Sequence, residues 1–141
     1  MISGIIDGIC EKLASEFGDG CRIYTESVEQ GFEEPCFFVQ LVSPSSRRLI
    51  GRRRFRQNLF AIQYFPSSKD PNAECCAMMD ALYIALERIE ADGDPLRGTG
   101  MRGELTDGVL SFFVNYDIYA VMREETAQME VLENPNIETK G

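Results

Sequence analysis

The sequence predicts an α+β domain: a mainly antiparallel sheet of about five strands with two helices on one face, in the order α-β-β-β-α-β-β. Two segments place apolar residues at helical spacing, and three others alternate with the two-residue period of strands. Helices segregated onto one face of an antiparallel sheet are the natural packing for this order. The 141 residues show no internal repeat and no interdomain linker, so we expect one domain.

The N-terminal segment is predicted to be an amphipathic helix that ends at Gly18 and Gly20. Its apolar positions are Ile2, Ile5, Ile6, Ile9, Leu13 and Phe17. A short strand over Cys21 to Glu26 and an acidic loop over Ser27 to Pro35 follow. Because this segment also carries acids and lacks a basic region, we expect no signal peptide and a cytoplasmic origin.

The middle of the chain is predicted to be a hairpin. Alternation over 37–42 and again over 60–64 indicates two strands, and Pro66 ends the second one. Between them, Ser43 to Arg53 contains Pro, Ser, Gly and most of the arginines. We therefore expect a long arginine-rich arm, with its tip near Pro44 to Gly51.

A second helix is predicted to begin at Asp70-Pro71, where the Asp side chain could accept hydrogen bonds from the first turn. Its buried face would hold Cys75, Met78, Met79, Leu82, Leu86 and Ile89. Strands over Leu96 to Leu105 and Val109 to Val121 follow, joined by a turn at Asp107-Gly108. The domain is expected to span 1–122, and 123–141 to form an acidic, flexible tail.

Composition argues against catalysis and metal binding. The chain has no histidine, and its five cysteines lack CxxC spacing, so we expect neither an enzyme nor a cofactor or metal. The GxGxxG match at Gly98 to Gly103 leads into a strand and not into a helix, which favours glycines that allow bulges or close backbone approach. The carboxylates of Glu90, Asp92 and Asp94 are interpreted as solvated loop charge.

Charge is strongly segregated. Six arginines fall within ten positions that contain no acid: Arg47, Arg48, Arg52, Arg53, Arg54 and Arg56. The net charge is −9, so the rest of the chain carries −15. Arginine suits bidentate contacts with carboxylate or phosphate. The partner could be an acidic protein surface or nucleic acid, or the segment could be a solvated loop. Because the acidic remainder repels phosphate, we expect contact between subunits and no direct DNA binding.

Four segments resemble the phage tail terminator proteins found in prophages of Gram-positive bacteria. They are MISGIIDGI, VEQGFEEPCFF (Val28 to Phe38), FAIQYFP (Phe60 to Pro66) and DGVLSFFVNYDIY (Asp107 to Tyr119). The resemblance covers the chain up to about Val121 and consists of fold-bearing segments. It implies a ring subunit, typically hexameric, that caps the head-proximal end of the tail tube, stops its polymerisation and offers a surface for joining the head.

The resemblance also implies partners and a location. The partners would be other copies of the chain and the tail tube protein, with tail sheath and head–tail connector proteins as further candidates, and no membrane. The location would be the virion tail, reached from the host cytoplasm. The six arginines would then contact a subunit or the tail tube. The alternatives are another head–tail joining protein and a nucleic-acid-binding module that uses Arg47 to Arg56.

Overall fold

The computed structural model describes residues 2–25, 33–122 and 130–133, and it confirms the α+β class. The helices are α1 (Ile2–Phe17) and α2 (Pro71–Ala85), with a 3-10 turn at Gly18–Gly20. The strands are β1 (Arg22–Tyr24), β2 (Cys36–Arg48), β3 (Arg53–Phe65), β4 (Arg88–Ala91), β5 (Asp94–Thr106), β6 (Val109–Met122) and β7 (Glu130–Glu133). Neither helix is long and apolar enough to cross a membrane.

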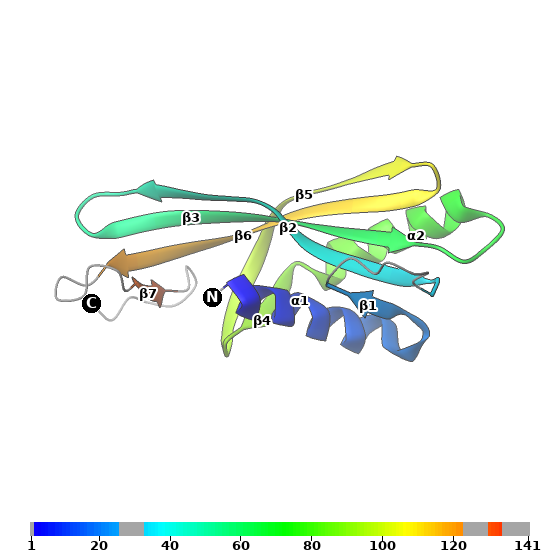
Figure 1. Cartoon of the computed structure of the whole chain (residues 1–141), viewed down its shortest axis with the longest axis horizontal. Helices are drawn as coiled ribbons and strands as arrows, with labels where there is room; N and C mark the ends of the chain where they lie inside the picture. The colour runs from blue at the N-terminus through cyan, green and yellow to red at the C-terminus, as the bar shows by residue number, and fades with distance from the viewer. Residues whose placement is uncertain (1, 26–32, 123–129, 134–141) are drawn as a thin grey trace.

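The strands form a sheet of order β1-β2-β3-β6-β5-β4, and β7 pairs with residues 119–122 at the end of β6 (Figure 1). Among the pairings of the described residues, β1 with β2 is parallel and the others are antiparallel. The predicted strands are all present. The short strands β4 and β7 add to them, because neither is long enough to show a two-residue period in the sequence.

The core lies between the helices and one face of the sheet. Phe37 is paired with Tyr64, and Ile62 with Phe112, so these side chains share a face. All are buried, together with Ile5, Ile9, Leu13, Val39, Phe60, Leu82, Leu110, Val114 and Tyr116. The alternation predicted for 37–41, 60–64 and the even positions of β6 through Ile118 is therefore confirmed.

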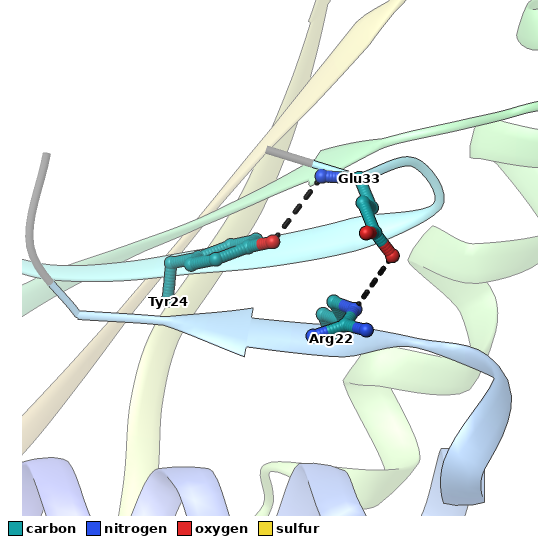
Figure 2. A network of polar contacts seen from close by, with 3 residues as sticks. All are labelled: Arg22, Tyr24 and Glu33. Carbon is teal, nitrogen blue, oxygen red and sulfur yellow. Dashed lines mark hydrogen bonds and ion pairs between the residues drawn. The ribbon is translucent and has the colours of Figure 1, made fainter. Parts of the chain in front are cut away.

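Polar contacts close the base of the connection from β1 to β2 (Figure 2). The Arg22 Nε lies 2.9 Å from Glu33 Oε2, and the backbone N–H of Glu33 donates to the Tyr24 hydroxyl at 3.2 Å. The Arg22 N–H also donates to the Pro35 carbonyl. These contacts position the start of β2. The predicted acidic loop lies largely outside the described residues.

The start of α2 agrees with the prediction, but its capping does not. Asp70 is the N-cap and Pro71 follows it, yet the Asp70 side chain makes no capping hydrogen bond. The Glu74 carboxylate instead accepts from the Tyr64 hydroxyl and from the Ser68 N–H. The Tyr64 hydrogen bond lowers the pKa of Glu74, so this carboxylate ties β3 to the first turn of α2 in its charged form.

The end of α2 corrects a second expectation. The helix ends at Ala85, and Ile89, which was predicted to lie on it, belongs to β4. Asp92 and Gly93 both have positive φ and connect β4 to β5 as a two-residue hairpin turn. Ile89 nevertheless remains buried, because β4 turns it toward the same core. The predicted turn at Asp107-Gly108 is present and has the same form.

The glycines of β5 allow close packing, as predicted. A Cβ on Gly98 would lie 2.6 Å from the Leu86 carbonyl oxygen, and one on Gly103 would lie 2.4 Å from the Met79 sulfur. Gly100 has positive φ within a register shift between Thr99 and Arg102. The Tyr116 hydroxyl donates to the same Leu86 carbonyl at 2.7 Å. The end of α2 is thereby held against the sheet.

The arginine-rich segment is not the long loop that the sequence suggested. Residues 43–48 continue β2, and residues 53–59 already belong to β3. The connection is only Leu49 to Arg52, so the expected tip near Pro44 to Gly51 is displaced toward the C-terminal end of that range. The tail predicted over 123–141 lies outside the described residues apart from β7, and its flexibility stays a prediction.

Gly8 sets how closely α1 approaches β4, and replacing it should destabilise the fold. A Cβ at Gly8 would lie 2.1 Å from the backbone oxygen of Glu90, which cannot rotate away. We expect Gly8→Ala to lower the free energy of unfolding by about 1–3 kcal/mol, as overpacking does. Urea unfolding measures it. Gly20→Ala, where nothing lies within 4 Å, is the control and should change little. Equal stability of both variants would contradict this packing.

A candidate interaction surface on the β2–β3 hairpin

The distal halves of three strands run from the margin of the core to beyond the helical layer. Residues 43–48 of β2, 53–59 of β3 and 115–122 of β6 form this extension, here called the sheet arm. In Figure 1 its tip projects past the N-terminal end of α1, with no helix beside it. A register shift between Leu41 and Ser43 marks where β2 leaves the core.

The register divides the arginines between the two faces of the sheet arm. Arg54 and Arg56 fall on the even positions of β3, on the same face as the core residues Phe60 and Ile62. Arg48 pairs with Arg54 and so joins them. Arg53 and Phe55 lie at odd positions of β3 and therefore face the opposite side. Arg47 pairs with Phe55 and so shares this opposite face. Arg52 lies in the tip. The cluster therefore surrounds the end of the sheet arm.

Like charges face each other across the hairpin. Arg48 lies directly opposite Arg54, and like charges so placed destabilise a strand pair. Within the described residues, neither of them nor Arg53 has an ion-pair partner. The three strands of the sheet arm contain one acid, Asp117, and β7, which pairs with the end of β6, begins at Glu130 and ends at Glu133. This arrangement costs stability in the isolated chain and suits a surface that meets carboxylates.

The face turned away from the helices carries a row of aromatic residues that the sequence analysis did not identify. The Arg47 guanidinium lies 5.4 Å from the centre of the Phe55 ring, and Phe55 packs against Tyr119 at 5.0 Å. Farther toward the body, Arg102 lies 4.4 Å from the Phe113 ring. The odd positions of 109–121 could have indicated this row, since Phe113 and Tyr119 alternate there with polar residues.

The outer edge of β2 is unsuited to pairing with another strand. β1 covers this edge only as far as Phe38, so residues beyond it have no strand neighbour on that side among the described residues. Pro44 lacks an N–H donor, and Arg47 and Arg48 add charge, which are devices that block edge pairing. Contacts of the sheet arm are therefore expected through its faces and its tip.

The tip presents an exposed aliphatic side chain among the arginines. Residues Leu49 to Arg52 form the connection, closed by the Leu49 N–H, which donates to the Arg53 carbonyl at 2.8 Å. Gly51 adopts a φ of +74° that lets the chain reverse. Ile50 is 94% exposed. Its position between Arg48 and Arg52 was visible in the sequence, but its exposure was not.

Two polar side chains lie at the root of the sheet arm with incomplete hydrogen bonding. The buried Asn58 donates from Nδ2 to the Tyr116 carbonyl at 3.1 Å, while its Oδ1 is without a partner among the described residues. On the opposite face, Asp117 Oδ2 accepts from the Thr99 hydroxyl at 3.4 Å, and the buried Oδ1 has no hydrogen-bond partner in the described part of the chain. Burial raises the pKa of Asp117.

The titratable groups of the core do not form a nucleophilic site. Burial raises the pKa of Cys10, Cys21 and Cys75, and that of Cys36 to about 11. These thiols are therefore protonated at neutral pH, whereas the thiolate is the reactive form. Among the described residues, no three His, Cys, Asp or Glu side chains are grouped as metal ligands. These cysteines therefore contribute to packing.

One comparison with known proteins identifies a family. A family model described as "Phage tail terminator protein" matches residues 4–129. The matched range includes β1 to β6, both helices apart from the first residues of α1, and the whole sheet arm. A search of the curated proteins finds no match.

Replacing Asp117 should stabilise the chain at neutral pH. Burial raises the pKa of Asp117 in the folded state, so the folded state binds the proton more tightly than the unfolded state does. The free energy of unfolding therefore falls as pH rises from the unfolded-state pKa of this carboxyl through its folded-state pKa. Asp117→Asn removes this titration. We expect a gain on the order of 1 kcal/mol at pH 7, the lower end of the cost of an unsatisfied buried group.

Urea unfolding at several pH values measures the difference, which should shrink as pH is lowered through the folded pKa. Asp80→Asn on the exposed side of α2 is the control and should follow the wild type. A destabilised Asp117→Asn variant at pH 7 would show that the charge has a partner.

Proposed function

Since this chain belongs to the phage tail terminator family and is a structural protein of the phage tail, we propose that it forms the ring that caps the head-proximal end of the tail tube. The ring stops polymerisation of the tube and offers the surface to which the head is joined. The family is structural and non-enzymatic.

The sheet arm is the observation that carries this proposal. It extends beyond the body of its own chain, and with its tip it holds the six arginines of residues 47–56, outside which the chain carries −15. A contact between arm and body uses two different patches of the same chain, which gives a head-to-tail arrangement that closes into a ring when the rotation allows. Single exposed ion pairs contribute only about 0.2–1 kcal/mol, so several must act together.

The partners follow from this position. Other copies of the chain complete the ring, six in number as in the resembling proteins, and the tail tube protein lies beneath it. Tail sheath and head–tail connector proteins are further neighbours at this end of a tail. The protein would assemble in the host cytoplasm and remain at the head-proximal end of the virion tail.

Two other functions would use the same surface. Another head–tail joining protein would also form a ring but would contact the head side and leave tube length unchanged. A nucleic-acid-binding module would use the arginines on phosphate, yet the acidic remainder of each copy repels a phosphate backbone. The partner of Arg47 to Arg56 is accordingly proposed to be protein.

Removal of charge at the tip should weaken assembly and leave the fold intact. The triple variant Arg52→Ser/Arg53→Ser/Arg54→Ser removes three guanidinium groups that lie outside the core, so we expect its thermal midpoint to stay near that of the wild type. We expect ring formation and tube capping to be weaker. Particle mass in solution measures the ring. Negative-stain images with tubes of the same phage measure capping, and added salt should weaken wild-type assembly.

Lys69→Ser, which removes an exposed positive charge that is not part of the sheet arm, is the control and should assemble normally. A triple variant that caps tubes as the wild type does but loses salt-dependent affinity for duplex DNA would establish the nucleic-acid alternative.

A further inference from the structure

The side of α2 that faces away from the core is unusually apolar for an exposed helix surface. Positions three and four residues apart form one stripe along the helix and the turn that follows it. The members of this stripe, here called the α2 stripe, are all exposed: Ala73, Ala77, Asp80, Ile84 and Glu87. Ile84 is 79% exposed. Since Leu82 and Cys75 bury the other side, α2 is apolar on both sides, which is typical of a helix that is covered all round.

The charged groups of the α2 stripe are carboxylates. Residues 70–87 contain four acids and no base, a net charge of −4. Glu74 is bound within its own chain by the Tyr64 hydroxyl. Asp80 and Glu87 have no ion-pair partner among the described residues. The stripe therefore offers two unpaired carboxylates with an exposed isoleucine between them.

Two bases adjoin this segment, one at each end, and neither forms an ion pair with the α2 stripe. Lys69 precedes the N-cap of α2 and is fifteen residues away from Ile84, about 20 Å along a helix. Arg88 begins β4 and lines the space between this strand and α1, together with Lys12. The middle and the C-terminal end of the stripe therefore keep their negative charge.

The tip of the sheet arm has the opposite charge and the same kind of apolar side chain. Arg48 and Arg54 lie directly opposite each other on the two strands, and neither has an ion-pair partner among the described residues. Ile50 lies in the connection between these strands and is almost fully exposed. An isoleucine with an arginine on each strand beside it thus matches an isoleucine flanked by two carboxylates.

The spacing of the two sets of charges is compatible. Asp80 and Glu87 are seven residues apart, which is about 10 Å along a helix. Directly opposed residues of an antiparallel pair, such as Arg48 and Arg54, have Cα atoms about 5 Å apart. Repulsion between the two guanidinium groups favours side chains that lean away from each other. A small outward lean of each arginine therefore brings one guanidinium to each carboxylate.

The tip lies far from the α2 stripe of its own chain. Figure 1 shows the tip at one end of the long axis and α2 toward the other end. Contact between them is therefore a contact between two copies. Surfaces at opposite ends of a chain give a head-to-tail arrangement, in which every copy can make the same contact with the next.

We propose that the β2–β3 tip of one copy packs on the α2 stripe of the next copy. In this contact Ile50 lies against Ile84, and the two unpaired arginines of the tip bind the two carboxylates of the stripe. Arginine is also among the side chains that dominate interface energies when water is excluded around them. This inference rests on the proposed ring and names the surface that receives the sheet arm.

The first test is a double-mutant cycle on the two isoleucines. Ile50→Ser and Ile84→Ser should each weaken assembly on the order of tenfold, the effect of truncating an interface anchor. The double variant should lose little more, because either change already breaks the contact. Val42→Ser truncates a half-exposed valine outside both surfaces and should assemble as the wild type does. Particle mass against concentration gives all of these values.

Two results of this cycle would overturn the proposal. One is an Ile84→Ser variant that assembles as well as Val42→Ser does. The other is a double variant whose loss equals the product of the two single losses, since residues that touch do not act independently.

The second test reverses charge on the two surfaces. Arg48→Glu/Arg54→Glu makes the tip acidic, and Asp80→Arg/Glu87→Arg makes the α2 stripe basic. Each variant alone should remain unassembled, because its tip and its stripe then carry like charges. Mixed in equal amounts, the two should form rings in which they alternate, because each tip then meets a stripe of opposite charge. Particle mass before and after mixing measures the effect.

Asp7→Arg/Glu11→Arg makes the same change of charge at two exposed positions of α1 and is the control, which should assemble alone. Thermal midpoints show that each variant is folded. If the wild type forms rings and the variant with the basic stripe does so equally well, or if mixing folded variants restores nothing, the α2 stripe is not the receiving surface and the proposed ring stands. A wild type that stays monomeric with and without tail tubes overturns the ring, and this inference with it.

Discussion

The register of β3 against β6 is the constraint on which the rest of the structure depends. The two strands pair from Arg53 with Val121 to Tyr64 with Leu110 without a shift. One half of this pairing lies in the core and the other half in the sheet arm. A slip of one residue would expose Phe60 and Ile62 and would exchange the two faces of the sheet arm together. Core packing therefore fixes which arginines point which way.

The sequence predicted the parts of the fold that bury one face and missed the parts that bury none. Alternation was clear over 37–42, 60–64 and 109–121, because packing on the helices selects apolar residues at every second position. Residues 43–48 have both faces exposed, so pairing with β3 decides their conformation and leaves no period. Ile89 was assigned to the second helix because a buried residue at this position fits both helical spacing and the alternation of a strand, and the sequence alone does not distinguish the two.

The charge of the candidate site was predictable, and its geometry was not. Six arginines without an intervening acid are evident from the residues alone, but their division between two faces follows from the pairing of Arg48 with Arg54. The exposure of Ile50 depends on the short tip, which the prediction of a longer loop concealed. The close approach of α1 to β4 at Gly8 was not predictable either, because it joins segments about eighty residues apart in the sequence.

The free chain retains features that lower its stability, and they concentrate in the sheet arm. Like charges lie opposite each other at Arg48 and Arg54, and at its root one side-chain oxygen of Asn58 and one of Asp117 lack a hydrogen bond from any described residue. Such costs persist where the residues serve another purpose. A carboxylate-bearing partner would offset the repulsion between Arg48 and Arg54 only after contact. In the proposed ring, the same two arginines would therefore weaken the monomer and favour the assembled state, which is a physical reason for a charge distribution that is costly in the free chain.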